Sequence, residues 1–152
     1  MRVIVCGSRD WEGIHAANRI HHVLDAVEVM AYQLRSPLTF VHGGCPTGAD
    51  AICDRWCRRR GYEPVIFAAN WAKLGNAAGP IRNSAVAISG GDMCIGFLKD
   101  NSGGTIDMMG KAKANGIPTF TVNWNEDQDL EDYLDQATQG SAWTVQSSIQ
   151  GR

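Results

Sequence analysis

Residues 42–50 read His-Gly-Gly-Cys-Pro-Thr-Gly-Ala-Asp, and this stretch decides the fold predicted for the chain. It follows an apolar run over residues 38–41 and opens a segment with helical spacing, so we expect it to connect a strand to a helix. At such a turn backbone N–H groups converge, the helix start carries partial positive charge, and glycine lets a ligand approach the backbone. The stretch therefore predicts a phosphate-binding loop in an α/β protein.

Short apolar runs alternate with helical segments along the rest of the chain. Strands are predicted over residues 2–6, 38–42, 63–68, 93–97 and 118–122. Helical spacing, bounded by glycine and proline, is found over about 20–34, 47–61, 80–88 and 102–116. This alternation predicts an α/β fold with a largely parallel sheet of about five strands and helices on both faces, a three-layer sandwich.

Local signals also predict where helices begin and which faces they bury. Thr47 and Asp50 are spaced as in a capping box, and Pro80 suits the first turn of a helix. The side chains expected to face the core are Ile81, Ala85 and Ile88 in one helix and Ile106, Met109 and Ala112 in the next.

Composition limits the class of protein. The 152 residues are 44% hydrophobic and 20% charged, as in an ordinary globular protein. The composition becomes acidic after Asn123, so we expect a nucleotide-binding domain over residues 1–125, followed by an acidic C-terminal helix and tail over 126–152. A net charge of −2 argues against nucleic acid as a partner, and no apolar run is long enough to cross a membrane. We expect a cytoplasmic protein with reduced thiols, because the five cysteines are an odd number without a secretory signal.

Three of the cysteines lie close together in the sequence. Cys53 and Cys57 are four residues apart and share a predicted helix face, with Cys45 just upstream. Zinc sites usually contain tighter pairs such as C-x2-C. We therefore expect buried thiols at Cys53 and Cys57, and no metal.

Three glycine-containing loops follow predicted strands: 7–9 (Gly-Ser-Arg), the loop over 43–50, and 102–105 (Ser-Gly-Gly-Thr). Because the carboxyl ends of parallel strands meet at one sheet edge, these loops predict a shared anionic ligand. None matches the Walker pattern or the G-x-G-x-x-G fingerprint. Arg82 and Asn83 lie in the first turn of their predicted helix, where an arginine gains nothing from the helix dipole.

A few other side chains are candidates for the same site. Trp71 is a candidate for stacking on a base, whereas Phe97 is expected in the core. His42 is the histidine best placed beside the loop. Of the two nearest carboxylates, Asp50 is explained by capping, and Asp107 could act as a base or hold a ribose.

Four motifs together carry a family resemblance: Val-Cys-Gly-Ser-Arg-Asp-Trp (5–11), the stretch at 42–50, Ala-Gly-Pro-Ile-Arg-Asn (78–83) and Gly-Thr-Ile-Asp-Met (104–108). Over residues 2–122 the chain resembles the YspA-type branch of the SLOG superfamily. The resemblance implies a Rossmann-like sheet with a nucleotide at the glycine loops. Other branches include cytokinin-activating phosphoribohydrolases, molybdenum-cofactor carriers, the DNA-processing protein of natural transformation, and sensors of ADP-ribose-like signals.

Position by position, the resemblance extends to single residues. Arg82 resembles the arginine that phosphoribohydrolases place before their catalytic helix. Their signature P-G-G-x-G-T-x-x-E ends in a catalytic glutamate, where this chain has Met108. Asp107 is one residue earlier, about 100° away around a helix. A methionine neither activates water nor stabilises an oxocarbenium-like transition state.

Two functions remain open at this point. The first is a sensor or sequestering protein for a nucleotide, ADP-ribose-like or NAD-derived ligand, which requires no cofactor and forms a homo-oligomer through the long first helix. The alternative is a nucleotide N-glycosidase in which Asp107 and Arg82 are catalytic. The ligand-binding residues expected in both are Gly7, Ser8, Arg9, Gly43, Gly44, Thr47, Gly48, Asp50, Trp71, Arg82, Asn83, Gly103, Gly104 and Thr105.

Overall fold

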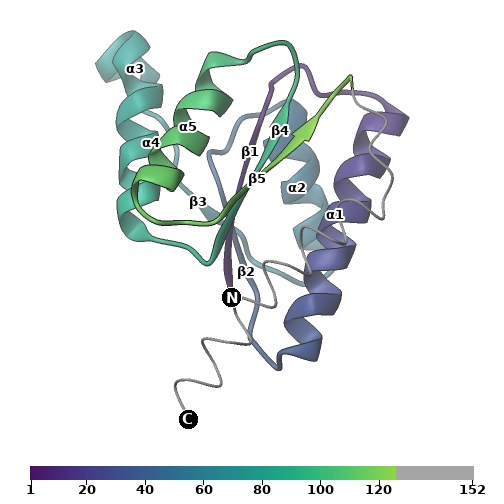
Figure 1. The fold of residues 1–152 in the computed structure, drawn as a ribbon. Helices are drawn as coiled ribbons and strands as arrows, with labels where there is room; N and C mark the ends of the chain where they lie inside the picture. The colour runs from purple at the N-terminus through teal and green to yellow at the C-terminus, as the bar shows by residue number, and fades with distance from the viewer. Residues whose placement is uncertain (126–152) are drawn as a thin grey trace.

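The computed structural model describes residues 1–125, which form one parallel sheet with helices on both sides (Figure 1). The strands are β1 (Arg2–Gly7), β2 (Thr39–His42), β3 (Val65–Ile66), β4 (Met93–Leu98) and β5 (Thr119–Asn123), in the order β3-β2-β1-β4-β5. The helices are α1 (Ile14–Gln33), α2 (Gly48–Arg59), α3 (Trp71–Leu74), α4 (Ala78–Ser89) and α5 (Gly103–Ala114), with a 3₁₀ turn, η1 (Gly75–Ala77), before α4.

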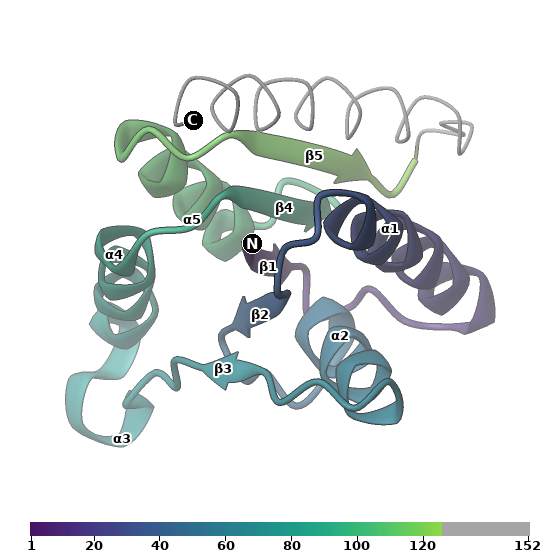
Figure 2. The ribbon, with the colours of Figure 1, turned by 90° about the horizontal axis from the view of Figure 1, so that it is seen from below.

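Helices α1 and α2 cover one face of the sheet, and α4 and α5 cover the other (Figure 2). Alternate strand residues therefore enter different cores. Val3 packs with Leu24 of α1 in the larger core, whereas its neighbour Ile4 packs with Val86 of α4 and Met108 of α5 in the smaller one. This arrangement confirms the Rossmann-like α/β fold predicted from the sequence, including its three layers.

The third strand is shorter than predicted. Only Val65 and Ile66 pair with β2, although the apolar run suggested residues 63–68. β3 lies at the edge of the sheet, where Pro64 costs no hydrogen bond to a neighbouring strand. The chain then continues through α3 and η1, so α4 begins at Ala78, two residues before the predicted start at Pro80.

The predicted inward face of α4 is wrong. Ile81 and Ile88 are 51% and 77% exposed, and Ala85 is also exposed. The buried side of the helix carries Asn83 and Val86 instead. Hydrophobic spacing failed here because a polar residue, Asn83, occupies the centre of the buried face.

A similar error affects one residue of α5. Ile106, expected to face the core, is 46% exposed, whereas Met109 and Ala112 are buried as predicted. The helix predicted near residues 130–136 and the tail after it lie outside the described residues. Within residues 1–125, no helix is long and apolar enough to span a membrane.

Candidate functional site

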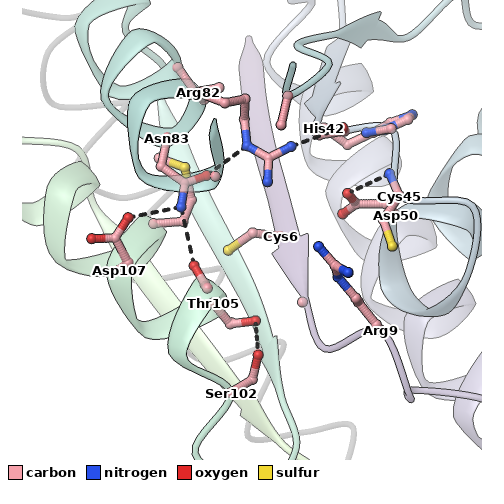
Figure 3. A pocket seen from close by; sticks show the side chains of 18 of the residues that line it. Cys6, Arg9, His42, Cys45, Asp50, Arg82, Asn83, Ser102, Thr105 and Asp107 are labelled. Atoms are coloured by element: carbon pink, nitrogen blue, oxygen red, sulfur yellow. Dashed lines mark hydrogen bonds between the residues drawn. The ribbon is translucent and has the colours of Figure 1, made fainter. Parts of the chain in front are cut away.

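A cavity of about 890 Å³ opens where the carboxyl ends of β1, β2 and β4 meet the first turns of α2, α4 and α5 (Figure 3). Loops and helix starts that are distant in sequence thus surround one space. The expected site residues that line it are Gly7, Arg9, Gly43, Gly44, Thr47, Asp50, Trp71, Arg82, Asn83, Gly103, Gly104, Thr105 and Asp107.

Ser8 and Gly48, also expected at the ligand, do not line the cavity. Ser8 is 1% exposed, and its hydroxyl accepts a hydrogen bond from the Lys99 amide at 2.9 Å and lies 3.2 Å from the Lys99 carbonyl. Gly48 has φ of +70°, and a Cβ there would collide with the Ser8 carbonyl. Both residues therefore pack the α2 loop against the end of β1 instead of facing a ligand.

The loop over residues 43–50 uses several of its amides internally. The Gly44 N–H donates to Nδ1 of His42 at 3.0 Å, and the Cys45 N–H donates to Oδ2 of Asp50 at 3.2 Å. The Ala49 N–H donates to the Ser8 carbonyl at 3.3 Å. Fewer amides are therefore left to bind a phosphate here than the glycine-rich sequence suggests.

His42 is a structural part of this loop. Its Nδ1 accepts from Gly44, so the ring proton lies on Nε2, which is 2.9 Å from Oδ1 of Asp54. The side chain is buried against α2. Both ring nitrogens thus hold the turn in shape.

The capping box predicted from Thr47 and Asp50 is not formed. The Thr47 side chain makes no hydrogen bond to the start of α2, and Asp50 turns back to the Cys45 amide. Asp50 is only 7% exposed. Burial raises the pKa of its carboxyl, while His42, the Cys45 amide and Arg82 act in the opposite direction.

Arg82 connects three parts of the site. Its Nη1 donates to the carbonyls of Gly43 at 2.9 Å and Phe67 at 3.3 Å, and its Nε donates to Oδ1 of Asn83 at 2.8 Å. Within residues 1–125, Nη2 has no acceptor and no carboxylate forms an ion pair with this guanidinium. Its charge therefore remains available to an anion in the cavity.

Arg9 is a second cation without an acidic partner among the described residues. Its guanidinium lies 5.1 Å from the ring centre of Trp71, which is 46% exposed. The pair joins the loop after β1 to α3. It brings a positive charge and an aromatic face to the rim of the cavity.

Asn83 and Asp107 join α4 to α5 on the other side of the cavity (Figure 3). Nδ2 of Asn83 donates to Oδ2 of Asp107 at 2.9 Å, and Lys111 donates to the same oxygen at 2.9 Å. Burial works against ionisation, but these two donors lower the pKa of Asp107 below its ordinary value. Asp107 is therefore a carboxylate at neutral pH.

The first turn of α5 faces the same space. Among the described residues, the N–H groups of Gly103, Gly104 and Thr105 have no acceptor, whereas the Ile106 N–H donates to the Ser102 carbonyl at 3.0 Å. A Cβ at Gly103 or Gly104 would meet no protein atom within 4 Å. This helix start therefore offers unused donors and open access at one place.

Known proteins that are similar to this chain identify its family. Residues 1–74 match the YspA, cpYpsA-related SLOG family. The Gene 61 protein of Mycobacterium phage D29 is 35% identical over 124 residues, which cover 78% of this chain and 94% of the relative. The chain belongs to the SLOG family. No solved structure matches it.

In this SLOG protein, Met108 is 3% exposed and packs into the smaller core with Ile4 and Val86. A carboxylate at that position would be buried among apolar side chains. Asp107, the neighbouring candidate, has one oxygen committed to Asn83 and Lys111. Met108 also lines the cavity, so the position where the resemblance places a catalytic glutamate carries a methionine at the site.

Sequence reasoning missed several residues that line the cavity, among them Cys6, Asp10 and Pro80. Cys6 lies in β1 on the same face as Ile4, so strand alternation was the signal that could have found it. A hydrogen bond with Cys94, together with burial, raises the pKa of the Cys6 thiol. The SLOG site therefore has a protonated, weakly nucleophilic thiol in its floor.

Other expectations concern residues away from the cavity. Phe97, Cys53 and Cys57 are fully buried, as predicted. Within the described part of the SLOG chain, no group of three or more His, Cys, Asp or Glu residues is arranged to hold a metal ion.

Proposed function

We propose that this SLOG protein binds a nucleotide or nucleotide-derived ligand, such as a mononucleotide, ADP-ribose or an NAD derivative, with the anionic group at the start of α5. The observation that carries the proposal is a pair of glycines that the fold does not require. Gly103 and Gly104 have no positive φ, and a methyl group at either position would have open space around it. Close approach of a ligand to the backbone explains why glycine stands there.

The contrast with the glycines of the other two loops supports the proposal. Gly7 approaches Ala49 and Phe97 too closely for a Cβ, and Gly44 has φ of +73°. Packing and backbone conformation thus explain Gly7 and Gly44. They do not explain Gly103 and Gly104, which face the cavity.

Charge and size are consistent with the same ligand class. Arg9 and Arg82 bring two cations without acidic partners in the described chain, and three helix starts direct their positive ends to the cavity. A volume of about 890 Å³ lies within the range of small-molecule sites. The exposed face of Trp71 is suited to stacking on a base. No resident cofactor is needed for such binding.

Glycine substitutions in α5 test the proposal. Gly104→Ala places a methyl group before the unused amides, and Gly110→Ala adds the same methyl where the helix faces open space outside the cavity. We expect AMP, ADP-ribose or NAD to raise the Tm of the wild type and of Gly110→Ala, but to raise that of Gly104→Ala much less. A panel that leaves the wild-type Tm unchanged, with no small molecule co-purifying, would exclude the proposal.

The second candidate is an N-glycosidase that releases the base of a nucleotide. The observation in its favour is Asp107, an ionised carboxylate at the cavity wall. The buried Met108 and the commitment of Asp107 to Asn83 and Lys111 favour binding over cleavage. We therefore place it second.

We further propose that the protein acts in the cytoplasm as a homo-oligomer. The five cysteines are free, which suits a reducing compartment. Helix α4 has apolar residues on both sides, with Val86 buried and Ile81, Ala85 and Ile88 exposed. Its exposed face carries no charge, so two copies pack there without repulsion. On α1, the exposed apolar residues are Ile14 near the start of the helix and Val29 and Tyr32 near its end, so the pair near the end spans a shorter stretch than those of α4.

A further inference from the structure

Asp50 is a buried carboxylate that is not salt-bridged to any described residue, although the charge of Arg82 favours its ionised form. Its carboxylate lines the cavity and is 7% exposed, yet it forms no ion pair with any residue from 1 to 125. Taking a carboxylate out of water costs several kcal/mol unless the charge is compensated. The presence of an aspartate at this buried position therefore requires an explanation.

The loop does not supply that explanation. The Cys45 N–H donates to Oδ2 of Asp50 at 3.2 Å, which holds the turn after β2. An asparagine side-chain oxygen would accept the same bond without a buried charge. Asp50 lies in the first turn of α2, where the helix dipole favours a negative charge by about 0.3–2 kcal/mol, less than the several kcal/mol that burial of a carboxylate costs. Part of this cost is therefore left for a group that enters the cavity to compensate.

The chemistry of that group follows from the charge. A phosphate beside Asp50 would be repelled, and the amides at the start of α5 and Arg9 offer it a better place. Figure 3 shows Asp50 across the cavity from Thr105 and Asp107, with Cys6 between them. A ligand that reaches both sides carries an anionic group at α5 and hydrogen-bond donors at Asp50.

We propose that Asp50 binds the ribose hydroxyls of the ligand and makes the site select ribonucleotides over their deoxy counterparts. The two oxygens of a carboxylate suit two neighbouring hydroxyl donors, and hydrogen bonds to a charged acceptor are among the stronger ones. This inference rests on the proposed nucleotide function. It assigns the sugar to the loop over residues 43–50 and the anionic group to α5.

The test compares matched ligands on the full chain. Binding of AMP and 2′-deoxy-AMP, CMP and 2′-deoxy-CMP, and ADP-ribose is measured by calorimetry. We expect the wild type to bind the ribo member of a pair about tenfold more tightly or better, because the deoxy ligand leaves a charged acceptor unpaired. Asp50→Asn, which keeps the acceptor for Cys45, is expected to reduce this preference to within about twofold and to weaken ADP-ribose about tenfold.

Asp100→Asn is the matched control. Asp100 is exposed and does not line the cavity, so the loss of its charge is expected to change affinity less than about twofold. Equal wild-type affinity for ribo and deoxy ligands overturns the role of Asp50 and leaves nucleotide binding intact. The same conclusion follows if Asp50→Asn keeps the wild-type preference for ribo over deoxy ligands. Failure of every ligand to bind overturns both proposals. The wild-type comparison needs no variant, so it stands even if Asp50→Asn folds poorly.

Discussion

The side-chain amide of Asn83 donates to the carboxylate of Asp107 at 2.9 Å, and this bond joins α4 to α5 at the wall of the cavity. Asn83 is 4% exposed and also binds Nε of Arg82 and the Gly104 carbonyl. One buried amide thus fixes both a cation and the helix start that we assign to the anionic group.

Removal of that amide is expected to destabilise the fold. Asn83→Ala removes the bonds from a buried amide to Arg82, Gly104 and Asp107, although Arg82 keeps Gly43 and Phe67 and Asp107 keeps Lys111. Loss of such buried hydrogen bonds costs about 1–3 kcal/mol. Urea unfolding measures the loss. Ser84→Ala, next on the same helix and exposed to a larger degree, is expected to change the free energy of unfolding by less than about 0.5 kcal/mol. Equal effects of the two variants would contradict this account of Asn83.

Arg82→Ala is expected to abolish the nucleotide-induced rise in Tm. It removes one of the two unpaired cations of the site and also the bonds to Gly43 and Phe67, so the ligand-free protein loses stability as well. Arg55→Ala, on the exposed side of α2, is the control for a lost positive charge. A shift retained at wild-type size in Arg82→Ala would show that the guanidinium does not contact the ligand.

Asp50 is expected to weaken the ligand-free protein at neutral pH. Burial raises its folded-state pKa above the ordinary value of 3.8, so its contribution to stability is present at low pH and is lost as pH rises through the folded-state pKa. Asp50→Asn should therefore raise the Tm at about pH 7, with a smaller gain toward about pH 4. Thermal melts across this range, without ligand, check the sign. A lower Tm for the variant at neutral pH would refute the prediction.

Catalysis, if present, depends on Asp107 in the second proposal. Incubation with AMP, CMP and NAD, followed by chromatography of free base, measures it. We expect no release above the uncatalysed rate in the wild type. Should base appear, Asp107→Asn is expected to reduce its release at least about a hundredfold. Release that persists in the variant would remove Asp107 from any catalytic role.

The exposed face of α4 predicts the oligomeric state. A charge in an apolar interface is costly to bury, so Ile88→Glu is expected to convert a dimer into a monomer in sedimentation experiments. Val29→Glu, on an exposed position of α1, should leave the assembly unchanged. A monomeric wild type would refute the proposed homo-oligomer. A dimer that persists in Ile88→Glu would show that the interface is not on α4.

The sequence predicted the sheet and its loops because their signals are local. Apolar runs, glycines and prolines mark strand ends and helix ends within a few residues of one another, and all five strands were located. The errors arose where tertiary contacts override local chemistry. Asn83 is buried because its amide binds Gly104 and Asp107 on α5. These partners are more than 20 residues away in the sequence, so hydrophobic spacing within α4 does not predict the contact. Ser8 was expected at the ligand because its partner, Lys99, is 91 residues away and the sequence alone does not reveal their hydrogen bond.

The segment of α3 and η1, residues 71–77, has no buried side chain. It is held by its own short hydrogen bonds, by the Asn70 cap on Lys73 and by Trp71 beside Arg9. Amide protons in such a segment exchange through local opening, at far lower free energy than the protons of β1 and β4 at the centre of the sheet. The cavity therefore combines a rigid floor, formed by the sheet, with an easily opened rim at α3 and η1. A ligand can displace this rim on entry without disturbing the sheet.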